Sequence, residues 1–471
     1  MNLKLSIPLL IFFSSWFGYS QTTNPRHPAE WEEISSVVME YRYFKSSNIN
    51  LDEAIDPYIK TAKACIEEGV HLYIIKPSNN SKYPHQADLD SIFKNRNISS
   101  PFVHLISKDT ILGSYPWARD HGMNFVYKND VGQAYLYNFP KDYTGDFIAK
   151  RMCFPNAIIR PKINHEYYTD GGNFLTDGHG TFNIAATDLS EDLPTSLEFE
   201  YDYFYQYFGI RKTLNVLVPF VHVDYFLKLI NEETAIISYI PNNNYDISID
   251  EYYDHQYYID RAASSISQYL KSAYGRDLKL IPIQNAPTTY DKKTETILAT
   301  SKATYTNSLI LNKTVLVPQY NMAPFDSLAL NTYEKAMPGY KIVGVNCRHY
   351  AQFSGAIHCL THEIYTDNPI YIKHKWYQGM VKNNVNGFPI SLVAKSSDGI
   401  QKAILYWKID ETTPYQSLQM KNIENDIFEA IIPPAKSGTT INYYLKIQNN
   451  NGKIMHKPMV APKYSYSFMI E

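Results

Sequence analysis

Amphipathic segments alternate with short apolar segments through the first three quarters of the chain. In residues 52–68, apolar side chains recur every three or four positions, Gly69 follows, and residues 70–75 are mainly apolar. The first pattern predicts an amphipathic helix and the second a buried strand. Glycine accepts the positive φ angle that commonly ends a helix. The same order of helix, glycine and strand recurs over residues 197–218, 250–281 and 327–345.

The glycines that end these predicted helices are spaced almost regularly. Gly209, Gly275 and Gly339 are 66 and 64 residues apart, whereas Gly209 follows Gly69 by 140 residues. The longer gap has room for a fifth, poorer unit at residues 144–159. A fixed period of this kind marks a repeat architecture, so five units predict a five-bladed α/β propeller. An ordinary α/β sheet with accidental spacing is the alternative.

The pattern changes after about residue 375. Residues 383–387 form an Asn-rich run typical of a linker, and short alternating strands follow. Asp398-Gly399 and Asn451-Gly452 lie between alternating runs, and such pairs are typical of hairpin turns. We therefore predict an all-β immunoglobulin-like sandwich over residues 376–471, although it lacks the cysteine pair that often joins the two sheets.

The N-terminus has the pattern of a secretory signal peptide. Lys4 precedes an apolar stretch of about 13 residues, which is too short to span a bilayer, and small residues follow at 18–20. We expect residues 1–20 to be removed, which leaves an α/β domain over residues 21–375. No later stretch is long and apolar enough for a membrane span, so the expected protein is exported, either secreted or periplasmic. A buried N-terminal helix or strand is the alternative.

Composition narrows the classes of function. Hydrophobic residues make up 44% of the chain, enough for a core, and 44 basic against 47 acidic residues give a net charge of −3. Without a strongly basic field, nucleic-acid binding is not expected. Four cysteines in 471 residues are too few for a disulfide scaffold, although export would permit any of three pairings. Cys65 falls within the first predicted helix and is expected in the core.

Cys359 is the first candidate for chemistry. It lies in the segment 353–363, shortly after Ser354-Gly355, where the backbone can approach a neighbour closely. A nucleophilic cysteine needs a histidine partner and a lowered pKa. A buried, inert cysteine is the plainer interpretation of this segment alone, and a metal site is a third. The ligands of such a site would be His358, Cys359, His362 and Glu363.

Two further segments pair polar groups that suit catalysis. His222 and Asp224 follow an apolar strand, where alternation would place both side chains on one face. A general acid/base would then stand beside a carboxylate that binds a cation, unless the two form a surface pair. Trp117 and Asp120 offer an aromatic wall and a second carboxylate, although Arg119 and Asp120 could equally form a solvated pair.

Five segments with candidate chemistry occur in one order along the chain. Singly they are weak; residues 170–173, for example, most simply shape a hairpin, since no phosphate-binding lysine accompanies their glycines. In this order they resemble the guanidino-group modifying enzymes, specifically the bacterial secreted peptidylarginine deiminases and the related agmatine deiminases, over about residues 28–375. The segments are Trp117 with Asp120, Asp170-Gly171-Gly172-Asn173, His222-Val223-Asp224, residues 305–309 and residues 355–359.

The resemblance implies a five-fold α/β propeller with the active site in its central pore and with no metal or organic cofactor. The positions that match the family's working residues are Asp120, His222, Asp224, Asn307 and Cys359. By this likeness Asp120 and Asp224 bind the guanidinium of the substrate. Cys359 is then the nucleophile, His222 moves protons, and Asn307 holds the nucleophile in place. Trp117 would flank the aliphatic stem of the substrate.

The substrate implied by the resemblance is an arginine in a peptide or protein. The expected signal peptide and C-terminal sandwich favour this branch of the family. One alternative is a small guanidino compound such as agmatine. Another is a binding protein that keeps the scaffold without catalysis.

One stretch departs from the family pattern. The characterised type prefers a C-terminal arginine, whose carboxylate is held by two arginines in a Tyr-Asn-Arg-Pro-Arg segment. The matching stretch here is Tyr137-Asn138-Phe139-Pro140-Lys141, and Pro219 stands where the family has a tyrosine. Phe139 cannot pair with a carboxylate, and Lys141 offers a point charge instead of a bidentate fork. We therefore favour an enzyme that accepts internal arginines or another guanidino substrate; the alternative is that Lys141 replaces the clamp.

Overall fold

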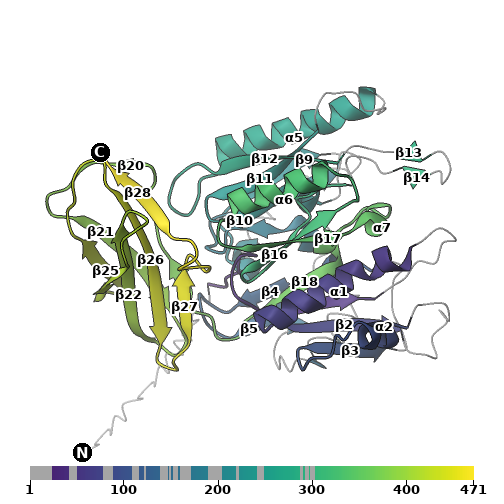
Figure 1. Cartoon of the computed structure of the whole chain (residues 1–471), viewed down its shortest axis with the longest axis horizontal. Helices are drawn as coiled ribbons and strands as arrows, with labels where there is room; N and C mark the ends of the chain where they lie inside the picture. Colours follow the sequence, from purple (N-terminus) through teal and green to yellow (C-terminus); the bar gives the residue numbers. More distant parts are fainter. Residues whose placement is uncertain are drawn as a thin grey trace, which may run out of the picture.

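The computed structural model has an α/β unit, coloured purple to green in Figure 1, beside a C-terminal all-β unit. The expected signal peptide, residues 1–20, lies outside the described part of the chain. The structure describes residues 24–41, 50–77, 88–108, 116–120, 124–137, 147, 150–151, 158–159, 171–188, 204–218, 222–240, 249–286, 290–291, 296–297 and 303–471.

One strand pattern repeats in five sheets of the α/β unit. Each sheet begins with an antiparallel pair, and a further strand then runs parallel to the second member of the pair. The sheet of β1 joins the two ends of the unit, because β1 is the first strand of the unit and its antiparallel partner β18 is the last. The strands of the five sheets are β18 (Thr361–Tyr365), β1 (Ile34–Glu40), β2 (His71–Pro77) and β3 (Val103–Lys108); β4 (Asn124–Tyr127), β5 (Ala134–Tyr137) and β6 (Ile158–Ile159); β7 (Leu175–Thr176), β8 (Asn183–Asp188) and β9 (Thr213–Val218); β10 (Leu227–Asn231), β11 (Thr234–Tyr239) and β12 (Lys279–Gln284); and β15 (Leu309–Leu311), β16 (Thr314–Gln319) and β17 (Lys341–Asn346).

Helices connect the parallel strands, as such strands require a crossover. α1 (Leu51–Glu68) joins β1 to β2 and ends at Gly69, whose φ of 68° confirms the predicted helix end. α6 (Phe325–Ala336) joins β16 to β17 where a helix was predicted. α5 (Ile249–Tyr269) is shorter than predicted, because Gly275 lies in the turn after the helix instead of at its end.

Two other predicted helices are only partly described. Residues 204–208 are helical and end at Gly209, with φ of 69°, as the sequence predicts. The fifth, poorer helix at residues 144–155 falls mostly outside the described residues. A short helix that the sequence analysis did not predict, α2 (Leu89–Asn95), lies between β2 and β3. A two-stranded ribbon, β13 (Tyr290–Asp291) with β14 (Thr296–Ile297), completes the described strands of the α/β unit.

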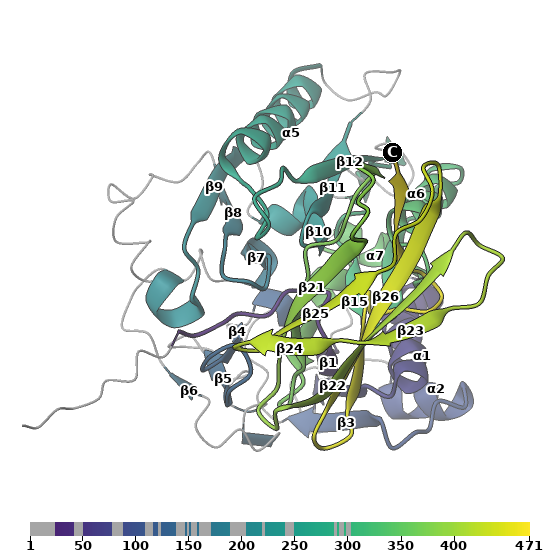
Figure 2. The ribbon, with the colours of Figure 1, turned by 90° about the vertical axis from the view of Figure 1, so that its left-hand side faces the viewer.

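The C-terminal unit consists of two sheets that share one core, and Figure 2 shows its strands crossing in front of the α/β unit. Gly452 lies in the hairpin between β26 and β27, as predicted. The Asp398-Gly399 turn instead leads from one sheet to the other, and residues 383–387 form a turn inside the unit instead of a linker. The strands are β19 (Tyr371–Lys373), β21 (Phe388–Lys395), β25 (Ile427–Ile432) and β24 (Lys421–Glu424) in one sheet, and β20 (Met380–Val381), β28 (Tyr466–Ile470), β26 (Thr440–Asn449), β22 (Ile400–Ile409) and β23 (Gln416–Gln419), with β27 (Ile454–Lys457), in the other.

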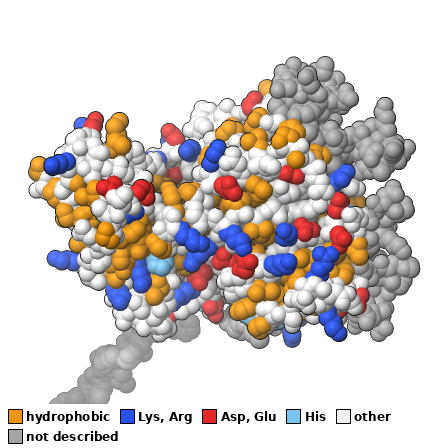
Figure 3. Space-filling view, viewed as in Figure 1, with side chains coloured by type: hydrophobic (Ala, Val, Ile, Leu, Met, Phe, Trp, Pro, Cys, Tyr) orange, Lys and Arg blue, Asp and Glu red, His pale blue; other side chains and the backbone are white. Residues whose placement is uncertain are grey.

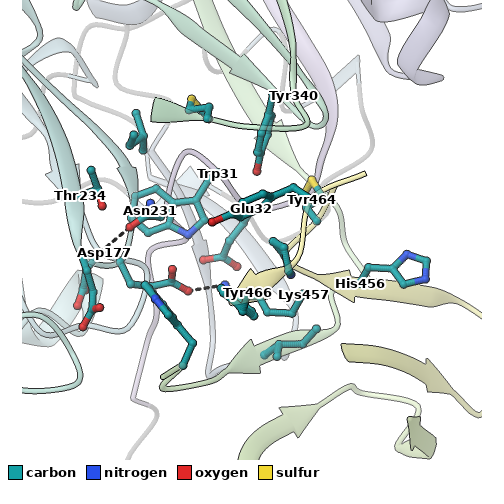
Figure 4. Close-up of a pocket in the computed structure, with 18 of the residues that line it drawn as sticks. Trp31, Glu32, Asp177, Asn231, Thr234, Tyr340, His456, Lys457, Tyr464 and Tyr466 are labelled. Carbon is teal, nitrogen blue, oxygen red and sulfur yellow. Dashed lines mark hydrogen bonds and ion pairs between the residues drawn. The ribbon is translucent and has the colours of Figure 1, made fainter. Parts of the chain in front are cut away.

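The two units meet across a polar interface that contains a cavity of about 490 Å³. Trp31, Tyr340 and Tyr464 lie close around this cavity in Figure 4. Ion pairs and hydrogen bonds from several elements cross the interface. Polar contacts therefore hold the two units together, in addition to aromatic packing. They are Lys457 with Glu232, Lys453 Nζ with Glu33 Oε2 at 2.7 Å, and Gln378 Nε2 with Glu233 Oε2 at 2.6 Å.

The visible surface mixes both signs of charge. Lysine and arginine alternate with aspartate and glutamate over the face in Figure 3, which agrees with the small net charge of −3. Among the described residues, no helix combines the length and the apolar character that a membrane crossing would need.

Candidate active site

The candidate residues come from equivalent places in the repeated sheets. Each lies in a short segment just before the first strand of its sheet, so five separate segments meet where these strands begin. The five segments are the short 3₁₀ turns η1 (Ala118–Asp120) before β4, η3 (Gly171–Asn173) before β7 and η4 (Val223–Tyr225) before β10, then Asn307 before β15, and the short helix α8 (Ile357–Leu360), which carries Cys359, before β18. Contacts among η1, η3, η4 and α8 confirm that these segments lie together.

Cys359 is buried, and hydrogen bonds from Asn307 hold both its sulfur and its backbone. The amide Nδ2 of Asn307 lies 3.2 Å from Cys359 Sγ. On its other side, Asn307 Oδ1 accepts hydrogen bonds from the backbone N–H groups of Ala356, at 3.1 Å, and Cys359, at 3.3 Å. Asn307 therefore fixes both the sulfur and the backbone that carries it. The predicted role of Asn307 as the holder of the cysteine agrees with this geometry.

Asp224 is the second group beside the sulfur. Its Oδ2 lies 3.6 Å from Cys359 Sγ and accepts a hydrogen bond of 2.9 Å from Asn307 Nδ2. His358 Nδ1 lies 2.8 Å from the same oxygen. The other oxygen, Oδ1, is buried and has no hydrogen-bond partner among the described residues. One carboxylate oxygen is thus held by the protein, and the other is left to accept from a ligand.

His222 and Asp120 form the more exposed side of the site. His222 Nδ1 lies 4.0 Å from Asp120 Oδ1, and their side chains are 12% and 32% exposed, whereas Cys359 is 3% exposed. The predicted alternation of a strand is wrong for His222 and Asp224, because β9 ends at Val218, His222 is the N-cap of η4, and Asp224 lies within that turn. The backbone direction changes there, so His222 faces Asp120 while Asp224 faces Cys359.

The Gly-rich segment leads into the antiparallel pair β7–β8, as the expected hairpin requires, but its two glycines lie just before the hairpin, in η3. Gly171 and Gly172 form η3, and a Cβ on Gly172 would lie only 2.5 Å from His222 Nδ1. A Cβ on Gly171 would lie 2.7 Å from the backbone oxygen of Arg119. Contacts this short would force one group to move, so only glycine allows η3 to pack against both segments. The glycines therefore set the position of the His222 ring.

Trp117 and the segment before Cys359 also approach closely. A Cβ on Gly355 would lie 2.6 Å from the Trp117 ring, which confirms the expected close backbone approach after Ser354. Trp117 also meets Tyr350 edge-on, with ring centroids 6.2 Å apart. The two other expected substrate-binding residues, Phe139 and Lys141, lie outside the described residues.

A buried ionic network lies beside the site; the sequence analysis named Arg119, His358 and Glu363 only in other roles and missed Glu30 and Lys228. His358 Nε2 lies 3.0 Å from Glu30 Oε1, and Lys228, itself buried, pairs with the other oxygen of Glu30. Arg119 pairs with Glu363 at 2.6 Å and is buried, so the alternative of a solvated pair between Arg119 and Asp120 is wrong. The only sequence signal for His358 was its place beside Cys359, and Glu30 carried none.

The metal alternative for this segment does not match the contacts. His362 Nδ1 lies 3.3 Å from the backbone oxygen of Ala118, away from the sulfur. Donor atoms of Glu30, His358 and Glu363 do lie within 4.8 Å of one another. Lysine and arginine side chains already neutralise these two carboxylates, so the group is an ion-pair network of the protein itself.

The electrostatics of the site suit a cationic substrate. Burial raises the pKa of the Asp224 carboxyl, but the hydrogen bond and charge of His358, with the charges of His222 and Arg119, outweigh burial and leave that pKa below its ordinary value. The pKa of the Cys359 thiol is raised well above its ordinary value, first by burial and then by the charges of Asp224 and Asp120. A bound cation would oppose these charges and favour the thiolate. The arrangement can hold a planar cation against two carboxylates and present a sulfur nucleophile to it.

Comparison with known proteins agrees with this chemistry. The model of the Porphyromonas-type peptidyl-arginine deiminase family matches residues 26–364. A protein of Legionella pneumophila named "Putative agmatine deiminase" is 22% identical over 353 residues, covering 71% of this chain and 93% of that protein. One of the same name from Enterococcus faecalis is 27% identical over 286 residues, covering 52% and 74%. The structure of the C. jejuni agmatine deiminase matches with a TM-score of 0.56 at 20% identity, over 73% of this chain and 96% of that one.

The family match spans most of the α/β unit and every candidate residue from Trp117 to Cys359. The chain belongs to the Porphyromonas-type peptidyl-arginine deiminase family. Its α/β fold is that of the agmatine deiminase structures, and the family and its relatives are guanidino-group deiminases, which hydrolyse C–N bonds.

Proposed function

We propose that this protein converts arginine side chains of peptides or proteins to citrulline and releases ammonia, through a covalent intermediate on Cys359. The observation that carries the proposal is the cluster around the sulfur. Asn307 Nδ2 and Asp224 Oδ2 lie 3.2 and 3.6 Å from Cys359 Sγ, and Asp224 Oδ1 is an open acceptor beside them. Membership of the deiminase family supports the reaction class.

The proposal includes the architecture expected from the sequence. The five sheets with one strand pattern are the blades of an α/β propeller, and the segments before their first strands converge on its centre. The two-sheet C-terminal unit is an immunoglobulin-like domain. Residues 1–20 direct export, and the enzyme acts on extracellular or periplasmic arginine. No metal or organic cofactor takes part.

Substrate binding uses the two carboxylates. A guanidinium is a planar cation with five N–H donors, and a carboxylate can accept two of them side by side. Asp224 Oδ1 accepts from the guanidinium on the buried side, and Asp120 accepts on the exposed side. Trp117 covers the aliphatic stem. The positive charge of the substrate then lowers the cost of ionising the Cys359 thiol, whose pKa the same two carboxylates raise.

The first half of the reaction forms the covalent intermediate. The Cys359 thiolate attacks the central carbon of the guanidinium and forms a C–S bond. Protonated His222 gives its proton to one terminal nitrogen, the C–N bond breaks, and ammonia leaves. A thiouronium of the substrate on Cys359 remains, and His222 is neutral.

The second half is hydrolysis of this intermediate. Neutral His222 takes a proton from water, whose oxygen attacks the same carbon, and the C–S bond breaks. The second proton of the water passes to solvent as the carbonyl forms, so the products are citrulline and the free Cys359 thiolate, and His222 is protonated again. The overall change consumes one water and one arginine cation and releases citrulline, ammonia and one proton, which together with ammonia gives ammonium.

A second candidate function is deimination of agmatine or another small guanidino compound. The relatives from Legionella and Enterococcus, which carry the agmatine deiminase name, favour it. The chemistry at Cys359 would be the same, so only the contacts to the rest of the substrate separate the two functions.

A panel of guanidino compounds tests the proposal and its alternative. We expect citrulline formation to have a higher kcat/KM on an acetylated, amidated arginyl peptide than on agmatine or free arginine. Citrulline or ureido product and ammonia would be measured for each compound, with the Cys359→Ala protein as the blank. Preference for agmatine would favour the second function, and no turnover of any compound would contradict both.

The departure at Phe139 and Lys141 predicts tolerance of internal arginines. Two peptides that differ only in whether the arginine is terminal or internal are expected to react with kcat/KM values within about tenfold, because the family's two-arginine clamp for a free carboxylate is missing. Amidation of the terminal peptide should then change little. A strong preference for the free carboxylate that disappears in Lys141→Met would contradict this expectation and restore the clamp.

The raised pKa of Cys359 predicts slow alkylation of the free enzyme. Neutral iodoacetamide should modify Cys359 more slowly at pH 8 than it modifies free cysteine, since the thiolate is the reactive form, and the rate should rise with pH. A cationic haloacetamidine should react much faster, because it supplies the missing positive charge. Peptide mass spectrometry would assign the modified residue. Equal rates for the neutral and cationic reagents would contradict the role given to the two carboxylates.

A further inference from the structure

His358, which precedes Cys359 in the chain, lies between the carboxylates of Asp224 and Glu30. Its side chain is fully buried, with Nδ1 2.8 Å from Asp224 Oδ2 and Nε2 3.0 Å from Glu30 Oε1. An ionised carboxylate only accepts hydrogen bonds. With both carboxylates ionised, both contacts are hydrogen bonds only when both ring nitrogens carry a proton, as they do in an imidazolium.

The surrounding charges agree with a positive His358. Lys228 and Arg119 are the other cations of the buried network, against the three carboxylates of Asp224, Glu30 and Glu363, so the network is neutral only when His358 is charged. Arg119 Nε also donates to the backbone oxygen of His358 at 3.2 Å, which fixes the segment beside the nucleophile. The titratable and charged groups that face His358 or its two carboxylates are Asp224, Glu30, Glu363, Lys228, Arg119, Cys359 and His222.

The geometry points to His358 as a positioning residue that keeps Asp224 ionised and oriented for the guanidinium of the substrate. This role rests on the proposed deiminase function. His358 and Asn307 together occupy Asp224 Oδ2, and they leave Oδ1 as the oxygen that meets the substrate. His358 itself touches no reacting atom, because both of its ring nitrogens face carboxylates of the protein.

The two carboxylates around His358 support this role. Burial raises the pKa of Asp224, and the hydrogen bond and charge of His358, together with the charges of His222 and Arg119, bring that pKa below its ordinary value. The pKa of Glu30 behaves in the same way: burial raises it, and the charges of Lys228 and His358 lower it well below its ordinary value. Without the imidazolium, Asp224 would remain buried 3.6 Å from a sulfur that must become negative. Its protonated form would then be favoured, and the substrate would lose a charged partner.

The first test measures binding without turnover. In a Cys359→Ala background, the affinity of an arginyl peptide is compared with that of the matching citrullyl peptide, whose ureido group is neutral. We expect His358→Gln to lower the preference for the guanidinium by about tenfold or more, because Asp224 would lose its fixed charge. A general loosening of the site would weaken both peptides alike and leave their ratio unchanged.

The second test is the acid side of the pH profile. Asp224 has a lowered pKa in the native protein, so activity that depends on its charge is lost only as the pH falls through that low value. Removing the imidazolium raises this pKa. We expect the acid limb of kcat/KM in His358→Gln, with Cys359 intact, to move to higher pH by about one unit or more.

Glu30→Gln keeps the test decisive if His358→Gln does not fold. This change removes one of the two negative charges beside His358, while the new amide oxygen can still accept a hydrogen bond from Nε2. The fall in the binding preference and the shift of the acid limb should therefore have the same direction as in His358→Gln but be smaller. Glu33→Gln is the matched control, because Glu33 lies in the same segment but pairs with Lys453 of the C-terminal unit. It should leave the binding ratio and the acid limb unchanged.

The outcomes separate this inference from the proposed function. An unchanged binding ratio and an unchanged acid limb in folded His358→Gln, or in Glu30→Gln, would overturn the role of His358 even though the enzyme deiminates arginine. Absence of turnover in the wild-type protein would contradict the proposed function instead, and the binding ratio would still report whether His358 tunes a cation site. A change of the ratio in Glu33→Gln equal to that in Glu30→Gln would also overturn the inference.

Discussion

Cys359→Ser is expected to lower kcat by on the order of 10⁶, the loss that follows removal of a covalent nucleophile. The serine hydroxyl is a weak nucleophile unless a base activates it. The groups nearest the sulfur are Asn307, which donates, and Asp224, whose Oδ2 already accepts from Asn307 and faces His358. Citrulline release from an arginyl peptide measures the loss, and thermal unfolding checks that the fold is unchanged.

The other cysteines provide matched controls for this result. Cys65 and Cys347 are also buried, with free thiols; Cys65 lies in α1, and Cys347 accepts a hydrogen bond from the backbone of Ile357 at the start of α8. Cys65→Ser and Cys347→Ser should keep kcat, even if each lowers the melting temperature. In the wild-type protein, acid quenching during turnover should trap a substrate adduct on the Cys359 peptide. Full activity in Cys359→Ser, or an adduct on another cysteine, would contradict the mechanism.

His222→Ala should lower kcat by about 10²–10⁴, the usual value of a positioned acid and base. His222 serves twice in the proposed reaction: it protonates the leaving ammonia and then deprotonates the attacking water. It lies on the exposed side of the site, 4.0 Å from Asp120, and the two carboxylates that bind the guanidinium remain in place without it. KM should therefore change much less than kcat. Added imidazole should restore part of the rate, because Gly172 leaves the space of the missing ring open.

A histidine outside the site gives the comparison for this variant. His456 lies on β27 of the C-terminal unit, and His456→Ala should leave both kcat and KM unchanged. The adduct on Cys359 should form more slowly in His222→Ala than in the wild-type protein, since His222 protonates the departing ammonia when the thiouronium forms. If His222→Ala kept its maximal rate and only bound substrate more weakly, His222 would be a binding group and not the proton carrier.

Much of the fold was predictable because it rests on local patterns. The helices at 52–68 and 327–336 and the strands that follow them are confirmed, since amphipathic spacing and a terminal glycine act within a few residues. Prediction fails where one local sequence is compatible with several structures and tertiary contacts determine which of them forms. Asp398-Gly399 has the sequence of a hairpin turn, yet the strands on its two sides pair with different partners. Nothing in the turn itself specifies which sheet each strand joins.

The candidate site was predictable for a different reason. Asp120, His222, Asp224, Asn307 and Cys359 were chosen by their order along the chain and their likeness to a family, and the structure brings Asp224, Asn307 and Cys359 into contact. The argument from strand alternation for His222 and Asp224 was wrong, although both side chains reach the site. The 3₁₀ turn η4 decides where each of them points, and the missing side chain of Gly172 leaves room for the His222 ring.

The sequence by itself determined the reactive residue types, the repeat of helix and strand, and the family to which the chain belongs. These depend on side-chain chemistry, on local spacing and on the order of motifs. Only the tertiary structure decided that Glu30, Lys228 and Arg119 surround the site. They lie far from Cys359 in the chain, and charged side chains are ordinarily exposed. Burial makes each of them dependent on a partner from another segment, and the partners become known only when the five sheets bring those segments together.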